Sequence, residues 1–195
     1  MSEIKHNASP ASVRPAYDLH KTVVMVGMMG AGKTAVGRAL AARLGVPFLD
    51  SDAEIESAAN MTIPEIFERD GEAFFRAKES QVIGRLLDEQ KGILSTGGGA
   101  FLSETNRRMI SERGVSVWLR ADLEVLWNRV RHKDTRPLLR TPDPHATLRA
   151  LYQARVPLYQ QADLVVDSDG ETAIEDMVDR VLEKLATRPD VLELK

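Results

Sequence analysis

Residues 27–34 carry the strongest chemical signal in this chain. Their sequence, Gly-Met-Met-Gly-Ala-Gly-Lys-Thr, matches the phosphate-binding pattern G-x-x-x-x-G-K-[ST] at every fixed position. Glycines let the backbone fold around an anion, so that its N–H groups and the positive end of the following helix point at the phosphates. The lysine reaches the outer phosphates and the threonine hydroxyl holds Mg²⁺. The motif therefore predicts nucleoside triphosphate binding by Gly30, Ala31, Gly32, Lys33, Thr34 and Ala35.

The segments on either side of this motif have the context that it needs. Residues 23–26 form an apolar run that is typical of a buried strand, and residues 35–44 carry apolar residues at helical spacing. The alternative is a glycine-rich turn that happens to contain a lysine. The strand before the motif and the helix after it favour a phosphate loop.

Composition sets the class of protein. A chain of 195 residues with 43% hydrophobic and 28% charged residues suits one α/β domain with a buried core. The absence of cysteine excludes disulfides and thiol catalysis, and it fits a reducing compartment, so we expect the cytoplasm. A net charge of −3 disfavours nucleic acid as a partner, and no apolar run is long enough to cross a membrane.

The two ends of the chain carry weak structural signals. Residues 1–20 have no apolar core, so they do not form a secretory signal. We expect a flexible leader over residues 1–20, a single domain over residues 21–187 and a short tail over residues 188–195.

The chain alternates strands with helices throughout. Apolar runs near residues 22–26, 46–49, 93–96, 115–119 and 164–167 read as strands, with helical patterns between them. This alternation predicts a parallel sheet covered by helices on both faces. Ligands of such sheets bind at the carboxyl ends of the strands. The phosphate loop, the pair Asp50 and Asp52, and residues 97–99 (Gly-Gly-Gly) all fall at that edge.

The segment over residues 132–145 differs from its surroundings. It contains three prolines and several basic residues without sustained apolar spacing, which predicts a mobile loop. Its basic residues suit a lid, over about residues 131–144, that closes on phosphates. A solvated basic loop is the alternative.

The phosphate loop alone does not choose among kinases, GTPases, motor ATPases and switches. The guanine-reading Asn-Lys-x-Asp is absent, and the D-x-x-G match at residues 167–170 comes too late in the chain. The strand near residues 93–96 ends without the acidic residue that motor ATPases place there. Asp50, at the end of the second strand, is therefore the best candidate for a metal-binding carboxylate beside Thr34. Helix capping is the alternative for Asp50 and Asp52.

Several short motifs occur in a specific order. After the phosphate loop come Asp-Ser-Asp at residues 50–52, Phe-Arg at 75–76, Gly-Gly-Gly at 97–99, Arg-Pro-Leu-Leu at 136–139 and Arg-Val-Pro-Leu-Tyr at 155–159. From about residue 21 to residue 185, this set resembles the shikimate kinase family. The resemblance implies a P-loop NTPase of the nucleoside-monophosphate-kinase type, a three-layer α/β/α fold with a five-stranded parallel sheet and a mobile lid. It also implies transfer of the γ-phosphoryl of ATP to the 3-hydroxyl of shikimate, a step towards chorismate and the aromatic amino acids.

The resemblance also implies roles for residues on the substrate side. Asp52 resembles the carboxylate that binds the shikimate hydroxyls and serves as base. Arg76 and Arg155 resemble the arginines that hold the substrate carboxylate, and Gly98 resembles a substrate-contacting backbone. The alternatives are a surface ion pair for Arg76, a solvated helix residue for Arg155 and a plain chain reversal at residues 97–99. Glu79 is placed to orient Arg76 from one helical turn away.

On the nucleotide side the implied residues are fewer. Arg136 resembles the lid arginine that reaches the ATP phosphates, and it joins Lys33 and Asp52 as a catalytic residue. Arg129 resembles a residue beside adenine. Glu171 stands where the family often has a basic adenine contact, so the adenine side departs from the pattern. Phe67 and Phe75 would wall the substrate ring, or simply belong to the core.

Three functions remain open on the residues. The leading hypothesis is a monomeric, Mg²⁺-dependent shikimate kinase with ATP and shikimate as its small-molecule partners. A kinase of another small hydroxy acid, such as gluconate, is the nearest alternative. A nucleotide-dependent switch that binds a protein partner is the third.

Overall fold

The computed structural model describes residues 16–132 and 139–195 of the chain. The main sheet is built from β2 (Thr22–Val26), β3 (Phe48–Asp50), β4 (Ile93–Ser95), β5 (Gly114–Ala121) and β6 (Leu164–Ser168). These five strands lie in the order β3-β4-β2-β5-β6, and every neighbouring pair is parallel. The predicted five-stranded parallel sheet is confirmed.

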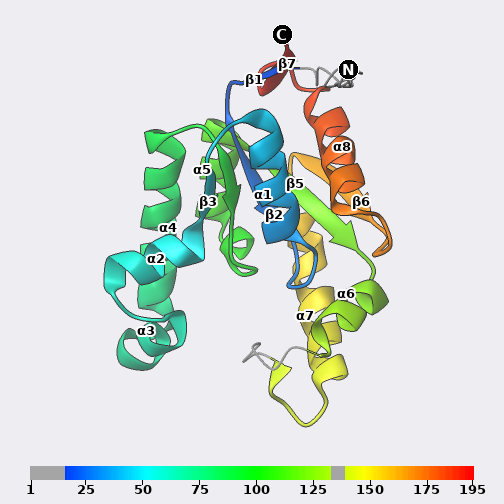
Figure 1. Cartoon of the computed structure of the whole chain (residues 1–195). Coiled ribbons are helices and arrows are strands. Elements are labelled where there is room, and N and C mark those ends of the chain that lie inside the picture. The colour runs from blue at the N-terminus through cyan, green and yellow to red at the C-terminus, as the bar shows by residue number, and fades with distance from the viewer. Residues whose placement is uncertain (1–15, 133–138) are drawn as a thin grey trace, which may run out of the picture.

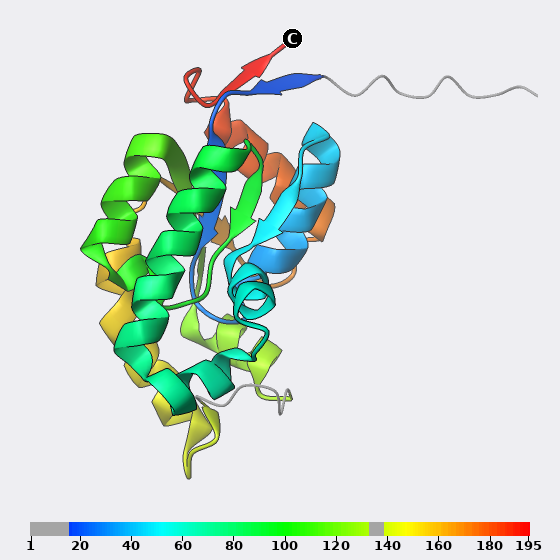
Figure 2. The ribbon, with the colours of Figure 1, turned by 90° about the vertical axis from the view of Figure 1, so that its left-hand side faces the viewer.

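Helices cover both faces of this sheet (Figure 1). They are α1 (Lys33–Leu44), α2 (Ser51–Ala59), α3 (Ile63–Asp70), α4 (Glu72–Glu89), α5 (Glu104–Arg113), α6 (Leu123–Val130), α7 (Pro144–Tyr159), α8 (Ile174–Leu185) and the short 3-10 helix η1 (Ala100–Leu102). Helices α1 and α8 pack together on one face, while α4 and α5 lie side by side on the other (Figure 2). No helix in the described ranges is long and apolar enough to span a membrane.

The central strand explains why both faces are covered. All of β2 is buried, and Val23, Val24 and Met25 are 0% exposed. Successive side chains of a strand point to opposite faces, so an unbroken apolar strand must be packed on both sides. Helix α8 meets this need with apolar residues on one face, and its buried side chains are Met177, Val178, Val181, Leu182 and Leu185.

The carboxyl edge of the sheet brings together segments that are far apart in the sequence. The phosphate loop follows β2, Asp50 ends β3, and residues 97–99 come shortly after β4. Asp50 lies directly beside Ser95 in the parallel register of β3 and β4. The predicted active-site edge is therefore formed as expected.

The two ends of the described chain pair in a second sheet, at the amino end of the strands (Figure 1). Strand β1 (Tyr17–Leu19) runs antiparallel to β7 (Leu192–Leu194), with Tyr17 opposite Leu194. The expectation of a flexible leader is wrong for residues 17–19, because these residues form a strand that is paired with residues 192–194 of the expected tail. Each strand has three residues, and its partner is more than 170 positions away in the sequence, so neither leaves a local pattern.

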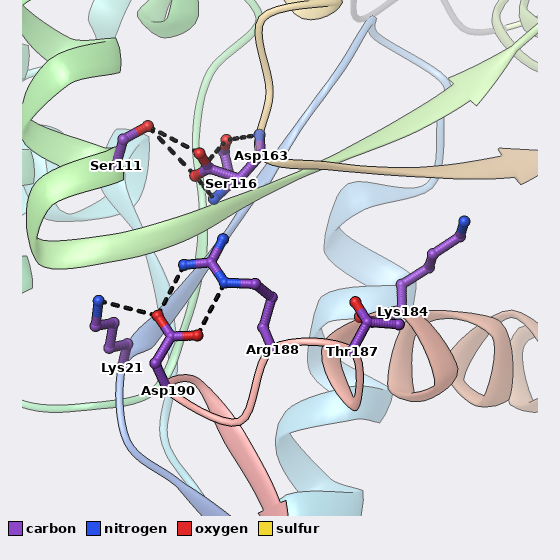
Figure 3. A network of polar contacts seen from close by, with 8 residues as sticks. All are labelled: Lys21, Ser111, Ser116, Asp163, Lys184, Thr187, Arg188 and Asp190. Atoms are coloured by element: carbon purple, nitrogen blue, oxygen red, sulfur yellow. Dashed lines mark hydrogen bonds and ion pairs between the residues drawn. The ribbon is translucent and has the colours of Figure 1, made fainter.

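A polar network lies beside this end of the sheet (Figure 3). The Asp163 carboxylate accepts hydrogen bonds from the Ser116 N–H at 2.9 Å, the Ser116 hydroxyl at 3.1 Å and the Ser111 hydroxyl at 3.1 Å. The Asp163 N–H in turn donates to the Ser116 hydroxyl at 2.8 Å. Asp163 therefore links the start of β6 to β5 and to α5.

The chain after α8 is held by a second set of contacts in the same region (Figure 3). Arg188 donates two hydrogen bonds of 2.8 Å to the Asp190 carboxylate, and Lys21 donates a third at 3.3 Å. The Arg188 guanidinium holds the pKa of Asp190 well below its usual range, with Lys21 adding to this effect. These contacts hold residues 188–190, which precede β7, next to Lys21, which precedes β2.

Substitution of Asp163 by alanine is expected to lower the free energy of unfolding by about 1–3 kcal/mol, because the Ser116 N–H would lose its acceptor. Ser116 is 0% exposed, so little water can replace the carboxylate. Urea denaturation measures the change. Asp88→Ala is the matched control, since its exposed ion pair with Arg113 is worth at most about 1 kcal/mol. Equal losses in the two variants would contradict a stabilising role for the network.

The predicted lid lies partly outside the described residues, and Arg136 falls in that part. On its far side, α7 begins at Pro144. The reason is local: the Asp143 carboxylate accepts a hydrogen bond from the Ala146 N–H at 3.1 Å, and proline suits the first turn of a helix.

Candidate active site

The phosphate loop between β2 and α1 has a backbone that requires glycine. Gly30 has a φ of 81° and Gly32 a φ of 94°. Residues other than glycine rarely adopt such a positive φ. A Cβ at Gly30 would also lie 2.7 Å from Cγ1 of Val130. Gly32 is the N-cap of α1 and offers no side-chain acceptor. The helix thus begins without a side-chain cap, as anion-binding helix N-termini do.

Lys33 opens α1 and bends back over the loop. Its Nζ donates a 2.6 Å hydrogen bond to the carbonyl oxygen of Gly27. Burial raises the pKa of Asp52, and the charge of Lys33 opposes that rise. Lys33 therefore stands between the phosphate loop and the carboxylate predicted to serve as base.

The carboxylates of Asp50 and Asp52 have different hydrogen-bond environments. The Oδ1 atom of Asp50 caps α2, accepting from the N–H groups of Asp52 at 2.9 Å and Ala53 at 3.2 Å. The capping interpretation is thus confirmed for Asp50, whose other oxygen accepts no hydrogen bond from the described residues. Asp52 does not cap a helix. Its Oδ1 atom is buried and has no hydrogen-bond partner among the described residues.

The environment of Asp52 favours its protonated form. Burial is the main cause that raises the pKa of Asp52, and the nearby charge of Asp50 adds to it, while Lys33 and Arg76 oppose the shift. A buried carboxylate oxygen without a donor is costly. A ligand hydroxyl would satisfy it, so the geometry suits both hydrogen bonding to an alcohol and removal of its proton.

The three glycines after β4 make room for three charged side chains. A Cβ added to any of them would collide with a different residue of the site. It would lie 2.9 Å from Oδ1 of Asp52 at Gly97, 2.8 Å from Nη1 of Arg155 at Gly98 and 2.6 Å from Nη1 of Arg76 at Gly99. The segment is therefore more than a chain reversal, because its lack of side chains brings one carboxylate and two guanidinium groups together.

Arg76 is oriented by its own helix. It donates a 2.9 Å hydrogen bond to Glu79, which is 1% exposed, and it lies 3.7 Å from Glu72. Burial raises the pKa of Glu79, and the hydrogen bond from Arg76 opposes that shift. The ion-pair interpretation of Arg76 is thus confirmed. It is compatible with ligand binding, since a guanidinium has five donors and Glu79 receives one of them.

Arg155 is not a solvated helix residue, because only 9% of it is exposed. It lies on α7 with its guanidinium against Gly98. Tyr159, one helical turn later, donates a 2.6 Å hydrogen bond to the Gly98 carbonyl. Sequence reasoning did not give Tyr159 a role. The available signal was its spacing of four from Arg155, which places both residues on one helix face.

Two aromatic rings stand on the substrate side. The centroids of Phe67 and Phe75 are 4.8 Å apart and the ring planes are inclined by 38°. Both rings line the cleft, and Phe75 is also part of the buried core with 4% exposure. Phe75 therefore belongs to the core, and the role of both rings as a wall for the substrate stays a prediction.

Arg129 joins the phosphate loop to the end of β6. Its Nη1 donates to the Gly30 carbonyl at 2.9 Å and its Nη2 to the Ser168 hydroxyl at 3.3 Å. Beyond it, three further residues that sequence reasoning missed line the cleft: Thr172, Ile174 and Met177. Glu171 is not among the lining residues, and its N–H donates to Asp169. Hydrogen bonds from Thr172 and Glu171 lower the pKa of Asp169 to about 2.

One cleft of about 1450 Å³ runs from the phosphate loop to the three glycines and the two arginines. Pockets for one small ligand usually measure about 300–1,000 Å³, so this cleft has room for two ligands side by side. Every predicted site residue within residues 16–132 and 139–195 lines it, and Arg136 lies outside these ranges. They are Gly30, Ala31, Gly32, Lys33, Thr34, Ala35, Asp50, Asp52, Arg76, Gly98, Arg129 and Arg155.

The three-layer fold and the phosphate loop define a P-loop phosphotransferase in which a nucleotide site opens into a second, acceptor site. A family model described as shikimate kinase matches residues 29–186. The chain belongs to the shikimate kinase family.

Individual relatives agree with the family model. A shikimate kinase of Ruegeria pomeroyi is 78% identical over 194 residues, covering 100% of both chains. One of Cereibacter sphaeroides is 73% identical over 175 residues, covering 90% of this chain and 87% of that one. A solved structure of the shikimate kinase of Acinetobacter baumannii in complex with shikimate is 40% identical, with a TM-score of 0.78 over 84% of this chain and 91% of that one.

Proposed function

We propose that this chain transfers the γ-phosphoryl group of ATP to the 3-hydroxyl of shikimate, giving shikimate 3-phosphate and ADP. The observation that carries this function is one cleft lined by the phosphate loop, Asp52, Arg76 and Arg155, in which the buried Oδ1 atom of Asp52 has no hydrogen-bond partner among the described residues. A hydroxy acid supplies what these groups lack. Its hydroxyl bonds to Asp52, and its carboxylate pairs with the two guanidinium groups.

The chemistry follows from the charges around the reacting atoms. The substrate hydroxyl oxygen forms a bond to the γ-phosphorus while the bond from that phosphorus to the β–γ bridging oxygen breaks. The hydroxyl proton passes to Asp52, and ADP leaves with the bridging oxygen. Because the transition state is loose, the base is needed late and charge neutralisation matters most. Lys33 supplies that neutralisation on the phosphate side.

The residues present fit Mg²⁺. The metal prefers hard oxygen ligands and keeps several waters, with one or two protein groups and the phosphates completing its shell. The Thr34 hydroxyl and the carboxylate oxygen of Asp50 that does not cap α2 are such a set. The described ranges contain no cluster of three or more His, Cys, Asp or Glu that could hold a metal, so no all-protein cage competes with this arrangement. When bound, Mg²⁺ neutralises phosphate charge.

The remaining roles are part of the same proposal. Arg129 lies beside the nucleotide, and Arg136 reaches the phosphates from a lid over about residues 131–144. Gly98 contacts the substrate through its backbone. A monomeric enzyme of the cytoplasm completes the proposal, and the absence of cysteine fits a reducing compartment.

Substitution of Arg155 or Arg76 by alanine is expected to raise the Kd for shikimate at least about tenfold, since a charge-assisted hydrogen bond contributes about 1.5–3 kcal/mol. The Kd for ATP should change less than about twofold, because neither guanidinium contacts the phosphate loop. Isothermal titration calorimetry measures both constants.

The two arginine variants should differ in stability. Arg76→Ala leaves the buried Glu79 without its partner, so it should lower the melting temperature more than Arg155→Ala does. Arg85→Ala, on the exposed side of α4, is the control for loss of a helix arginine. If the Kd values for shikimate and ATP rise by the same factor in these variants, the substrate site has been misplaced.

A coupled assay of ADP release tests the proposed function. Release should depend on added shikimate and show little stimulation by gluconate. Stimulation by gluconate alone would assign the chain to another hydroxy acid. Slow release that neither compound stimulates would favour a nucleotide switch.

A further inference from the structure

Tyr159 lies directly behind the acceptor side of the cleft. Its side chain is 0% exposed, and its hydroxyl donates a 2.6 Å hydrogen bond to the carbonyl oxygen of Gly98. Its ring packs between Trp118 and Phe101, with centroid distances of 5.9 Å and 6.3 Å. The ring therefore has a fixed position, and the hydroxyl reaches out of the core to the backbone that lines the site.

The same hydroxyl lies beside Arg155. A Cβ at Gly98 would lie 2.8 Å from Nη1 of Arg155 and 3.9 Å from the Tyr159 hydroxyl oxygen, so both groups face the same glycine. Burial raises the pKa of Tyr159, and the charge of Arg155 opposes that shift. The tyrosine proton is used on the Gly98 carbonyl, so towards the guanidinium, which only donates, the hydroxyl can act only as an acceptor.

The orientation of the Gly98 carbonyl also orients the next N–H group. No peptide bond in the described residues is cis, so the Gly98 carbonyl and the Gly99 N–H point in opposite directions. The Gly99 N–H donates to no acceptor in residues 16–132 and 139–195. Gly99 lines the cleft, so a carbonyl directed at Tyr159 leaves this N–H for a ligand.

We propose that Tyr159 is a positioning residue that holds two donors, the Arg155 guanidinium and the Gly99 N–H, in the geometry that receives the substrate carboxylate. This inference rests on the proposed hydroxy-acid substrate. Tyr159 does not touch the substrate, and it acts through the two groups that do. Phenylalanine would fill the same space among the aromatic rings, so packing does not account for the hydroxyl.

Tyr159→Phe in the full chain tests this role. Loss of the hydroxyl frees the Gly98 peptide and Arg155 to rotate, so the KM for shikimate should rise about tenfold. The KM for ATP should change less than about twofold and kcat less than about threefold, because the phosphate side is untouched. Tyr152→Phe is the matched control, since it removes a hydroxyl from the same helix that makes no hydrogen bond in the described part of the chain. Equal kinetics in the two variants would overturn the proposal.

A ligand without charge gives a readout that a loss of packing would not produce. Shikimic acid amide lacks the carboxylate, so Tyr159→Phe should change its Kd less than about twofold. An equal loss for shikimate and its amide would show that Tyr159 only supports the shape of the pocket. In an Arg155→Ala background, Tyr159→Phe should add much less than its separate effect, because both act on one carboxylate. If the two effects multiply fully, Tyr159 and Arg155 do not act together on the substrate carboxylate.

A measurement on the wild-type chain makes the test independent of how any variant folds. The signal of the Gly99 N–H proton should shift downfield in NMR spectra when shikimate is added. It should not shift when shikimic acid amide is added. No shift with shikimate would overturn the assignment of this N–H. A wild-type chain that does not phosphorylate shikimate at all would refute the proposed function instead, so the two failures are distinguishable.

Discussion

Replacement of Lys33 by methionine is expected to lower kcat for phosphoryl transfer by about 10²–10³-fold while the fold stays intact. Methionine keeps the length and apolar stem of the side chain and removes only the ammonium group. In the present structure this group bonds to the Gly27 carbonyl at 2.6 Å, inside the phosphate loop. In the proposed reaction, negative charge develops on the transferred phosphoryl group beside this ammonium. A steady-state coupled assay measures the loss.

The fold of this variant is checked by circular dichroism and thermal melting. Lys91→Met is the matched control, because Lys91 is exposed in the turn before β4 and lines no part of the cleft. Its kcat should equal that of the wild type. A folded Lys33→Met chain that keeps most of its turnover would show that the loop is not catalytic here.

Asp52→Asn is expected to lower kcat by about 10²–10⁴-fold, since the amide cannot accept the substrate proton. The effect should be specific to Asp52, because its Oδ1 atom is buried and has no hydrogen-bond partner among the described residues. Gly97, which lies against this oxygen, has no side chain that would cover it. The KM for ATP should change little. Asp88→Asn, an exposed aspartate on α4, is the control and should keep full activity.

The stability of the same variant has a predicted pH dependence. Burial raises the pKa of Asp52 in the folded chain, so the folded state binds this proton more tightly than the unfolded state does. The wild type therefore loses stability as the pH rises through the folded pKa, whereas Asp52→Asn does not. Urea denaturation at several pH values should show the variant gaining on the wild type across that window. Activity of the wild type should fall in acid, at a pH above the usual pKa of aspartate, as the base becomes protonated.

A parallel trend in the two chains would contradict this account. If the difference in free energy of unfolding were constant with pH, Asp52 would titrate alike in folded and unfolded chains. The unpartnered oxygen would then not be buried from water as the structure has it.

Local patterns in the sequence were sufficient for the main elements of the fold. The phosphate loop is defined by glycines and a lysine at fixed spacing, and residues 23–26 form a run that only a doubly covered strand explains. The order of strands and helices then placed the phosphate loop, Asp50 and the three glycines at one edge of the sheet. These features depend on backbone preference and periodic burial, which neighbouring residues determine. The family resemblance added the residues expected on each side of the cleft.

Other features depend on groups that meet only after folding. Asp50 caps α2, whereas the Oδ1 atom of Asp52 has no hydrogen-bond partner among the described residues. This division follows from how α2 leaves β3. The pairing of β1 with β7 joins chain ends whose short strands carry no pattern of their own.

The three glycines at residues 97–99 also depend on contacts that form only when the chain folds. Their sequence marks a break after β4, but the reason for three of them is that Asp52, Arg76 and Arg155 arrive from α2, α4 and α7 at separations too small for any side chain. The role of Tyr159 also depends on that arrival, because its hydroxyl bonds to a carbonyl 61 positions earlier in the chain. A contact of this kind is decided by the packing of helices on the sheet, and no local pattern of residues records it.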